Sequence, residues 1–428
     1  MEVLFLSHRI PFPPNKGEKI RAHAMVAHLS QHHTVHIGAF VDDPADLEHE
    51  EALKALAGGE CFLPRLSPKL VYPMGLAALM RGGPITTSYF GNAAMKSWIG
   101  QLLAKRRIDC AVVFGSAMAP YMMNRSDFDP SKVVLDLVDV DSDKWRQYAQ
   151  AAVGPKRWIY EREADTLLEL ERAAAAHFGA TLLVSPYEVQ TFERLAPESV
   201  GSIHSVANGV DFSFFSSDHN FPNPYPKNEI PLVMTGAMDY HPNVDGAYWF
   251  AKFVMPLVSA RLPNARFYVV GSKPARALTE AGLRNTVITG RVADVRPYIA
   301  HAAASVAPLR IARGVQNKVL EAMAHEKPVV ATTAASRALA ARPGRDFWLA
   351  DDPDMFADAV IAAAMGPERA LVAANGRRYV ESYHDWSRNL ASLDALLETA
   401  AGKVNAVTSL HNEAEADQSR PAPFAGAI

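Results

Sequence analysis

The sequence predicts an α/β protein made of two doubly wound halves with parallel sheets. In each half, short β-branched runs alternate with helical stretches, which is typical of consecutive βαβ units. Between the halves, residues 213–231 hold four prolines and many polar side chains, which predicts a linker. The 428 residues, 49% of them hydrophobic, suffice for two or three full cores and exclude a disordered chain.

The first half, residues 1–212, starts with a predicted buried strand at 3–7. A Pro/Gly-rich loop and a helix over about residues 18–30 follow it. A stretch rich in Ala, Glu, Arg and Leu over roughly 142–178 is predicted to be a long helical stretch. The remaining predicted strands of this half cover residues 34–40, 111–114, 133–138 and 181–185.

The second half, residues 232–375, repeats the alternation of strands and helices. Its predicted strands cover residues 232–236, 266–271, 287–289, 304–308 and 328–332, and its helices include 245–260, 295–302 and 317–325. We expect the helix that ends at 402 to pack back, from residue 376, on the N-terminal domain. Residues 403–428 lack periodicity and are predicted to be a disordered tail.

Composition and missing motifs exclude several functions. With 43 Lys and Arg against 46 Asp and Glu, the chain is no polycation built to hold nucleic acid. Cys61 and Cys110 are too few for a disulfide scaffold or a multi-cysteine zinc site, and we expect buried free thiols. No GxGxxG or P-loop motif is present. No apolar run has the length of a signal peptide or membrane span, so we expect a cytoplasmic protein.

The most informative stretch is 304–332, in which a strand, a loop and a predicted helix start follow one another. Amides at a helix start favour an anion, and Lys318 in the first turn is placed to reach a phosphate oxygen. Glu321 shares its helix face and has the chemistry to accept hydrogen bonds from a ribose diol. Gly314 allows a close approach to the backbone. Spacing alone also fits, and favours, a surface helix with an exposed Lys–Glu pair.

This stretch resembles the donor-binding signature of the retaining GT-B glycosyltransferases of family four. The resemblance extends from residue 1 to about 400 and is most specific to glycosyltransferases of bacterial exopolysaccharide clusters associated with exosortase systems. It implies the GT-B fold, in which two Rossmann-like domains face each other across a cleft. The matching segments are SHRIPFPPNKGEKIR, NGVD at 208–211, TGAMDYHPNVDGA at 235–247, FYVVGSKP at 267–274, TGRVADVRPYIAHA at 289–302, KVLEAMA at 318–324 and KPVV at 327–330.

The resemblance implies a nucleotide-sugar donor, with its base and ribose on the second domain and its sugar in the cleft. By match to the family, Glu321 binds the ribose, and Lys318 faces the diphosphate. The remaining donor-binding residues that the resemblance implies are Arg291 and Val292 along the base, Gly17 at the phosphates with Lys19 nearby, and Gly236, Arg313 and Gly314 in the loops of the second domain. The nucleotide sugar is the substrate, and we expect no cofactor and no metal.

Two features depart from the family pattern. Gly314 stands where many members have a first glutamate, and the loop at 237–241 lacks the usual Arg and Lys. We therefore expect Lys318, Arg310 or Arg313, and the helix dipole to neutralise the diphosphate. Cations placed where charge develops on the leaving group stabilise the transition state of such a reaction most, so Lys318 is a predicted catalytic residue.

Asp139 is the second predicted catalytic residue, as a contact to the acceptor or the sugar. It follows the strand at 133–138, at an edge where α/β proteins bind ligands. Two other interpretations of VVLDLVDVDSDKW stay open: a DxD metal motif, and capping of the helix that follows. The histidines at 32, 33 and 36 lack complementary metal ligands and are expected on the surface or in a strand.

These observations favour a retaining glycosyltransferase that moves a sugar to a polysaccharide or lipid-linked saccharide in exopolysaccharide biosynthesis. A GT-B epimerase or hydrolase and a non-catalytic nucleotide-sugar binder are the alternatives. A peripheral contact with the inner face of the cell membrane is a further hypothesis. It draws on the basic amphipathic stretch at 95–107, for which packing on the sheet is the alternative, and on KRWIYER at 156–162.

Overall fold

The computed structural model describes residues 1–14, 17–67 and 71–402 and divides the chain into two compact units. Unit 1 is Met1–Val206 with Leu390–Ile428, and unit 2 is Ala207–Asn389. The boundary expected at residue 212 lies a few residues after the division at Val206. The boundary expected at residue 375 lies about one helix before the division at Asn389. The predicted disordered tail at 403–428 lies outside the described residues.

Unit 1 is a seven-stranded parallel sheet in the order β3-β2-β1-β4-β5-β6-β7. The order reverses between β1 and β4, as in doubly wound folds. The strands are β1 (Glu2–Ser7), β2 (Thr34–Ala39), β3 (Gly58–Phe62), β4 (Cys110–Phe114), β5 (Val133–Val138), β6 (Ala180–Leu183) and β7 (Ile203–Ser205). The two outermost strands, β3 and β7, were not predicted, because they are short and only partly buried.

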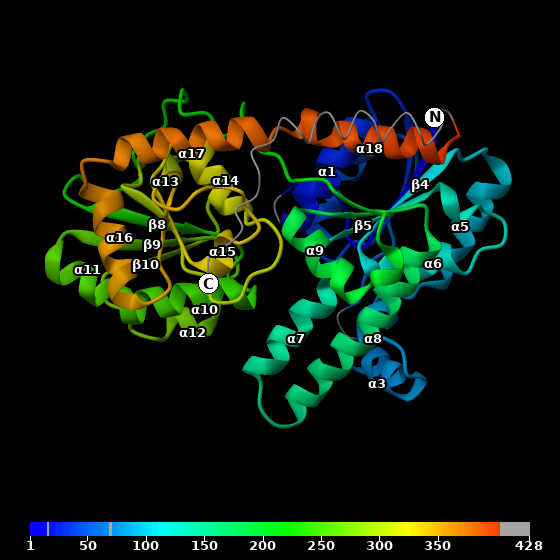
Figure 1. Cartoon of the computed structure of the whole chain (residues 1–428), viewed down its shortest axis with the longest axis horizontal. Helices are drawn as coiled ribbons and strands as arrows, with labels where there is room; N and C mark the ends of the chain where they lie inside the picture. The colour runs from blue at the N-terminus through cyan, green and yellow to red at the C-terminus, as the bar shows by residue number, and fades with distance from the viewer. Residues whose placement is uncertain (15–16, 68–70, 403–428) are drawn as a thin grey trace. The chain divides into compact units, whose positions relative to one another are not determined.

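Helices cover both faces of this sheet, with α1 on one side and α6 and α8 on the other (Figure 1). Because both faces are covered, β1 and β4 are almost wholly apolar. The α-helices of unit 1 are α1 (Gly17–Leu29), α2 (Glu50–Ala57), α3 (Val71–Arg81), α4 (Ile85–Tyr89), α5 (Ala93–Lys105), α6 (Pro120–Met123), α7 (Asp141–Ala151), α8 (Pro155–His177) and α9 (Pro186–Leu195).

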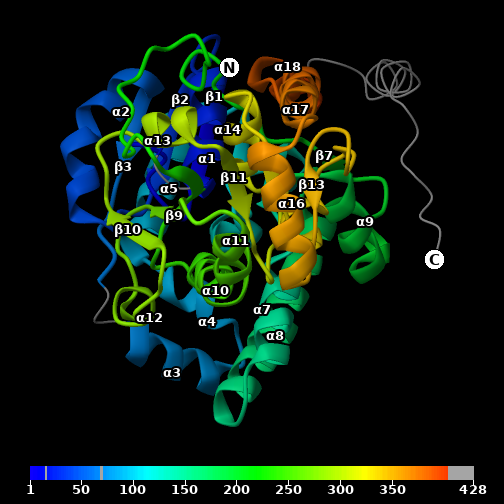
Figure 2. The same ribbon diagram turned by 90° about the vertical axis from the view of Figure 1, so that its left-hand side faces the viewer.

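The helical stretch predicted over 142–178 is helical in the structure but is divided into two helices, α7 and α8. α7 and α8 lie side by side as a hairpin in both ribbon views (Figures 1 and 2). The chain reverses at Gly154, whose φ of 64° and ψ of −148° are conformations that a residue with a Cβ rarely adopts, and Pro155 opens α8. The helical composition on both sides of this turn conceals it in the sequence.

Unit 2 is a six-stranded parallel sheet in the order β10-β9-β8-β11-β12-β13. Its strands are β8 (Ile230–Thr235), β9 (Ala265–Val270), β10 (Thr286–Gly290), β11 (Ala304–Ala307), β12 (Val329–Ala331) and β13 (Trp348–Leu349). Its helices are α10 (His241–Trp249), α11 (Met255–Arg261), α12 (Arg276–Thr279), α13 (Arg296–His301), α14 (Asn317–Ala324), α15 (Thr333–Ser336), α16 (Pro353–Met365) and α17 (Arg369–Tyr383). In both views α13, α14 and α17 lie on one side of the sheet, and α10, α11 and α12 on the other (Figures 1 and 2).

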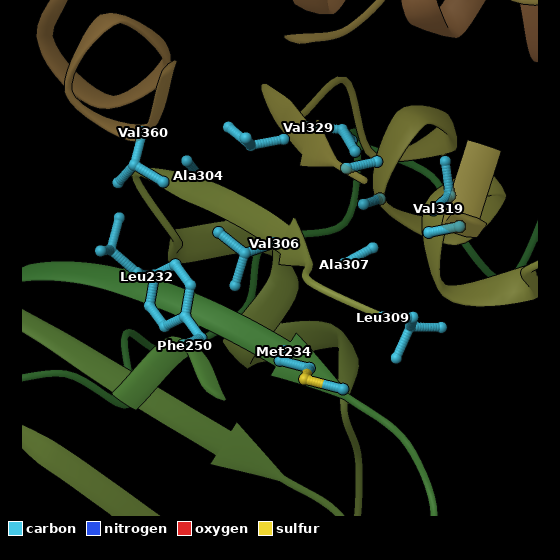
Figure 3. Packing of buried hydrophobic residues seen from close by; sticks show 14 of the residues in the cluster. Leu232, Met234, Phe250, Ala304, Val306, Ala307, Leu309, Val319, Val329 and Val360 are labelled. Carbon is cyan, nitrogen blue, oxygen red and sulfur yellow. The ribbon is translucent and has the colours of Figure 1, made fainter. Parts of the chain in front are cut away.

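The core of unit 2 lies between this sheet and its helices (Figure 3). Leu232 and Val306 of neighbouring strands, Phe250 after α10 and Val360 of α16 are all fully or almost fully buried. Burying side chains of this size stabilises the fold by about 1.5–3 kcal/mol each. The core therefore holds β8 and β11 in register, and with them the loops that follow these strands.

The segment predicted as a linker packs closely on unit 2. The Tyr225 hydroxyl donates to the carbonyl oxygen of Tyr298 at 2.6 Å, and the side chain of Tyr225 is buried. The His301 ring contacts the carbonyl oxygen of Phe221 at 2.7 Å, and the Arg296 guanidinium lies 3.8 Å from the centroid of the Phe214 ring. Residues 213–231 are thus a strap that is part of unit 2.

The C-terminal helical region is interrupted at His384 and continues as α18 (Trp386–Ala400). The division between the units falls within α18, after Asn389. In unit 1, Leu393 and Leu397 of α18 are buried, and Asp394 contacts the His28 ring of α1 at 2.7 Å. Across the described residues, no helix is both long enough and apolar enough to span a bilayer.

Candidate functional site

The candidate site lies at the carboxyl ends of the central strands of unit 2, where the backbones of two loops come close together. Gly236 follows β8 with φ 150°, and its amide donates to the carbonyl oxygen of Val270 at 3.0 Å. A Cβ on Gly271, after β9, would lie 1.6 Å from the carbonyl oxygen of Gly236. Only glycine at 271 permits this approach, which leaves the Gly236 loop flat against the sheet end.

Lys318 of α14 points at this loop. Its ammonium donates a hydrogen bond to Oδ1 of Asn243, while Nδ2 of Asn243 donates to the carbonyl oxygen of Ala237 at 2.9 Å. A Cβ on Gly236 would lie 2.7 Å from Nδ2 of Asn243 and 3.3 Å from Nζ of Lys318. Asn243, which is 6% exposed, therefore joins the start of α14 to the loop after β8.

Glu321 lies one turn along α14 from Lys318, and both side chains are half-buried. Burial raises the pKa of Glu321 to about 7, an effect that the charge of Lys318 opposes. Burial likewise lowers the pKa of Lys318 to about 8, opposed by Glu321. The two groups are thus a coupled pair of opposite charge near neutral pH, and the exposed surface pair that spacing alone favoured is not what forms.

The start of α14 has no side-chain cap from its N-cap residue. The amide group of this residue, Gln316, instead donates to the carbonyl oxygen of Arg313 at 2.9 Å. Gly314 is buried in the left-handed region, with φ 60°. Arg313 is half-buried in the same loop, so the predicted residues 313, 314, 318 and 321 lie on one loop–helix junction.

Arg310 is already engaged by an acidic partner. Its guanidinium forms a bidentate pair with Asp245 of α10, with one contact of 2.9 Å between Nε and Oδ2. This hydrogen bonding raises the pKa of Arg310 above its usual value. Of the two arginines expected to assist Lys318, Arg310 would have to leave Asp245 to reach a diphosphate.

The loop predicted to run along the base follows β10. The amide of Gly271 donates to the carbonyl oxygen of Gly290 at 3.3 Å, which ties this loop to the end of β9. Arg291 is exposed, and Val292 is half-buried against the cluster that contains Tyr225 and Tyr268. The structure therefore brings the predicted loops of unit 2 to one edge of its sheet.

The two donor residues predicted in the first half belong to unit 1. Gly17 is the exposed first residue of α1. Lys19 is only 1% exposed, and its ammonium forms an ion pair with the buried carboxylate of Asp46. This partner occupies Lys19 inside unit 1, so we leave Lys19 out of the proposed donor site.

Asp139 follows β5 in unit 1, half-buried, with an oxygen 4.0 Å from Nζ of Lys144. The first aspartate of the stretch, Asp136, is fully buried, pairs with Arg21 at 2.8 Å and accepts from the amide of Val138 at 2.9 Å. Asp136 therefore has a structural role. Among the described residues, no group of three or more His, Cys, Asp and Glu is placed to hold a metal ion.

The helix after β5 is not capped by its own aspartates. Its N-cap is Val140, whose amide donates to Glu188 at 3.1 Å. The amide and hydroxyl of Ser142 donate to the two oxygens of Glu171, which is fully buried. Burial raises the pKa of Glu171 to about 8. The capping interpretation expected aspartates of the DxD segment to accept the hydrogen bonds at this helix start. Carboxylates from α8 and α9 accept them instead.

Two residues with clear roles were not predicted as such: Asn243 and Glu171. Asn243 stands next to Pro242 at the start of α10. An amide side chain that follows closely after a predicted strand and Gly236 is the signal in the sequence that could have pointed to it. Glu171 gives no such signal, because it lies within a helix whose composition suggests a solvated face.

Other expectations fall on structural residues. In the stretch at 95–107, Met95, Ile99 and Leu102 are buried in unit 1, so packing on the sheet is confirmed there. His36 is buried and contacts Glu2 at 2.6 Å. Both cysteines are free thiols; Cys110 is buried, whereas Cys61 is only partly buried, with a pKa raised by burial to about 11.

Comparison with known proteins shows which fold this chain shares and which family part of it resembles. Residues 229–365 match the family model described as "Glycosyl transferases group 1", a span that contains Gly236, Asn243, Lys318 and Glu321. No curated protein matches the sequence significantly. Two parallel sheets with interleaved helices match solved GT-B glycosyltransferases, so the chain has the GT-B fold, and residues 229–365 are similar to the group 1 glycosyl transferases.

Three solved structures show how far the likeness of fold extends. Sucrose-phosphate synthase (tll1590) from Thermosynechococcus elongatus is 16% identical with a TM-score of 0.70, over 94% of this chain and 100% of that chain. Alr3699/HepE from Anabaena, solved in complex with UDP and glucose, is 14% identical with a TM-score of 0.65, over 93% and 99%. WaaG, a glycosyltransferase involved in lipopolysaccharide biosynthesis, is 16% identical with a TM-score of 0.62, over 95% and 100%.

Proposed function

We propose that this protein is a retaining glycosyltransferase that transfers a sugar from a nucleotide-sugar donor to a polysaccharide or lipid-linked saccharide acceptor in exopolysaccharide biosynthesis. The observation that carries the proposal is the Lys318–Asn243 hydrogen bond beside Gly236, with Glu321 one turn away, inside the group 1 domain. It combines a cation and an acceptor for ribose hydroxyls on the first turns of α14 with a glycine loop beside them.

In this proposal Lys318 neutralises the diphosphate. An ammonium has three donors, and among the described residues Asn243 takes one of them, which leaves two for phosphate oxygens. Negative charge grows on the diphosphate as the glycosyl–phosphate bond breaks, so a fixed cation stabilises the transition state more than the bound donor. Arg313 and the open first turn of α14 add to this field.

Glu321 orients the donor through its ribose. In its ionised form the carboxylate accepts hydrogen bonds from two vicinal hydroxyls, and no described residue forms a hydrogen bond or ion pair with it that would compete. The loop at Arg291 and Val292 would lie along the base. Asp139 and Gly17 of unit 1 stay predictions for the acceptor and the phosphates.

The donor base proposed for the first trial is uracil, because HepE from Anabaena was solved with UDP and with UDP-glucose. Thermal unfolding of the full chain with UDP, ADP or GDP tests it, since a ligand that binds the native state at one hundred times its Kd adds about 2.7 kcal/mol of stability. We expect UDP to stabilise the protein well above ADP and GDP, and a larger effect of ADP or GDP would contradict uracil as the base. Stabilisation by none of them would contradict the donor site.

Two variants test the roles of Lys318 and Glu321. Lys318→Ala should lower kcat by about 10²–10³-fold, because it removes a preorganised charge from the leaving group. Glu321→Ala should weaken binding of the nucleoside diphosphate by about tenfold or more, because it removes hydrogen bonds to a charged acceptor. Lys252→Ala and Glu280→Ala, exposed residues of the same unit, are the matched controls. Wild-type behaviour of the two site variants would remove both residues from the site.

The reaction itself distinguishes transfer from its alternatives. Incubation with labelled nucleotide sugar and a saccharide acceptor should yield a glycoside whose anomeric configuration, measured by NMR, equals that of the donor. Altered free sugar would indicate an epimerase or hydrolase, and bound nucleotide without turnover would indicate a binding protein. We propose that no metal or cofactor takes part, so a chelator should leave the rate unchanged.

A further inference from the structure

We propose that one end of unit 1 docks on an anionic lipid surface. The surface, here called the basic apolar tip, combines the turn between α7 and α8 with the exposed face of α3. Its defining residues are Leu76, Met80, Arg81, Val153, Lys156, Arg157 and Trp158. The proposal goes beyond sugar transfer and does not rest on it, because lipid binding is measured without turnover.

Large apolar side chains are exposed throughout the tip. Val153 is 86% exposed and Trp158 58%, and on α3 Met80 is 77% and Leu76 60% exposed. Leu76 and Met80 stand four residues apart, so they share one face of α3. Four large apolar side chains exposed at one end of a unit have no role in its core and mark an interaction surface.

Specific hydrogen bonds hold the two parts of the tip together. The Arg162 guanidinium of α8 donates to the carbonyl oxygens of Ala78 and Gly83, each at 3.2 Å. Trp158 lies one turn before Arg162 on the same helix face. Both ribbon views place α3 and the α7–α8 turn at the same end of unit 1, where the hairpin projects away from its sheet (Figures 1 and 2).

A second anchor fixes the chain just after α3. Both oxygens of Glu163, which is buried, accept hydrogen bonds from α4, from the amide of Ile85 at 2.7 Å and that of Thr86 at 2.9 Å. Hydrogen bonds with the side chains of Arg162 and Glu163 therefore fix the backbone of the tip, while its apolar side chains are exposed.

The charge of the tip points to an anionic partner. Residues 74–84 and 151–161 contain three cations, Arg81, Lys156 and Arg157, and one acidic residue, Glu161, which leaves a net charge of +2. Arg157 pairs with Glu161 at 2.8 Å, and Lys156 lies over the Tyr160 ring. A net positive charge around exposed apolar side chains matches a bilayer with acidic headgroups, since each basic residue near such a surface contributes about fivefold in affinity.

The side-chain types favour a lipid surface over a protein groove. A tryptophan prefers the headgroup level of a bilayer, where its ring is buried and its N–H stays near water. Val153 and Trp158 lie at the projecting turn between α7 and α8, which can enter the boundary between headgroups and acyl chains, and Leu76 and Met80 lie on α3. The proposed partner is therefore an anionic membrane.

Vesicle sedimentation with the full chain tests this proposal. The probes are vesicles of phosphatidylcholine alone and of phosphatidylcholine with phosphatidylglycerol. We expect the protein to sediment with the anionic vesicles only, and added salt to weaken this binding. Absence of binding to anionic vesicles, or equal binding to both kinds, would overturn the proposal.

Two variants locate the contact. Lys156→Glu with Arg157→Glu should lower vesicle affinity at least about tenfold. Trp158→Ser with Met80→Ser should lower it several-fold, whereas Trp158→Phe should retain most of it while abolishing a blue shift of tryptophan emission on the vesicles. The matched control, Lys252→Glu with Phe253→Ser, changes an exposed cation and a 48% exposed ring of unit 2 and should bind as wild type.

Thermal unfolding of each variant keeps the test independent of folding, because all these residues are exposed and their replacement should leave the melting temperature nearly unchanged. Vesicle binding by the tip variants equal to wild type would place the contact elsewhere and overturn the proposal. A self-associated wild type that Trp158→Ser converts to monomers, without vesicle binding, would show a protein interface instead and also overturn it.

Discussion

At the residue scale, Asn243 has the greatest consequence for its neighbours. It is buried, uses its carbonyl oxygen for Lys318 and uses its amide nitrogen for the carbonyl oxygen of Ala237. A lysine side chain carries about 2 kcal/mol of rotamer entropy. Because Asn243 already fixes Lys318, less of this entropy is lost when a ligand binds. The loop at 237–241 lacks the basic residues of the family pattern that the sequence resembles, and the hydrogen bond to Asn243 holds Lys318 in place beside this loop.

We predict that Asn243→Ala lowers kcat about tenfold or more, because Lys318 loses its anchor, and leaves the fold intact. Asn243→Asp keeps an acceptor for Lys318 and adds a negative charge, which raises the pKa of that lysine. The pH–rate profile of the aspartate variant should therefore extend further to alkaline pH than that of wild type. An unchanged kcat in the alanine variant would show that Asn243 does not position Lys318.

The pKa values of the Lys318–Glu321 pair predict the pH range of donor binding. Ionised Glu321 is required for the ribose and protonated Lys318 for the diphosphate. The pKa of Glu321 is raised to about 7 and that of Lys318 lowered to about 8, so binding should strengthen as pH rises through the first value and weaken above the second. Calorimetric titration of the nucleoside diphosphate over this range measures it. In Lys318→Ala the alkaline decline should disappear; its persistence would assign it to another group.

At the element scale, the strap at 213–231 is fixed to the end of α14 through a buried histidine. His325 is 1% exposed and is the C-cap of α14; its ring contacts Phe215 edge to face, with centroids 5.7 Å apart. Neither ring nitrogen has a hydrogen-bond partner among the described residues. Burial, together with electrostatic repulsion from Lys327, Arg296, His219 and Arg377, lowers the pKa of His325 to about 4.

We predict that this histidine makes unit 2 sensitive to acid. The pKa in the folded state lies below the unfolded value of 6.5, so its contribution to stability is complete above 6.5 and is lost as pH falls from there towards 4. Between about pH 7.5 and about pH 4.5, His325→Leu should lose roughly 2–3 kcal/mol less free energy of unfolding than wild type. Denaturant titration at both pH values measures it, with exposed His32→Gln as the control. Equal losses in wild type and His325→Leu would contradict the prediction.

At the scale of the whole molecule, the two units carry different parts of the predicted chemistry. The proposed donor-site residues Gly236, Asn243, Lys318 and Glu321 belong to unit 2, whereas Asp139 and the basic apolar tip belong to unit 1. The group 1 match at 229–365 lies entirely within unit 2. Donor recognition should therefore be a property of unit 2, and lipid contact a property of unit 1.

We predict that a bound nucleoside diphosphate slows hydrogen exchange mainly in three segments of unit 2: 236–243, 290–292 and 313–321. These loops share the carboxyl edge of one sheet and carry the proposed contacts. Mass spectrometry of the full chain with and without ligand measures it, with the edge strand β13 and α16 as internal controls. Added protection at Gly17 would support its predicted phosphate contact, and protection spread evenly over unit 2 would indicate general stabilisation.

Much of the fold could be predicted from local patterns, because a strand covered on both faces must be apolar and a helix start needs its own residue types. The sequence pattern placed β8, β9 and β11 and the start of α14 within a few residues of their observed positions. It missed the α7–α8 turn, because Gly154 and Pro155 interrupt a composition that is helical on both sides. It also missed β3 and β7, whose short, partly exposed runs resemble loops.

By itself, the sequence determined the alternation of strands and helices, the two halves and the chemical character of Lys318 and Glu321, since these depend on residue type and short-range order. The tertiary structure alone decided which polar groups are partners: Asn243 for Lys318, Asp46 for Lys19, Asp245 for Arg310 and Ser142 for Glu171. Such pairs join residues distant in the chain, and whether a charge is available to a ligand depends on what the fold buries beside it.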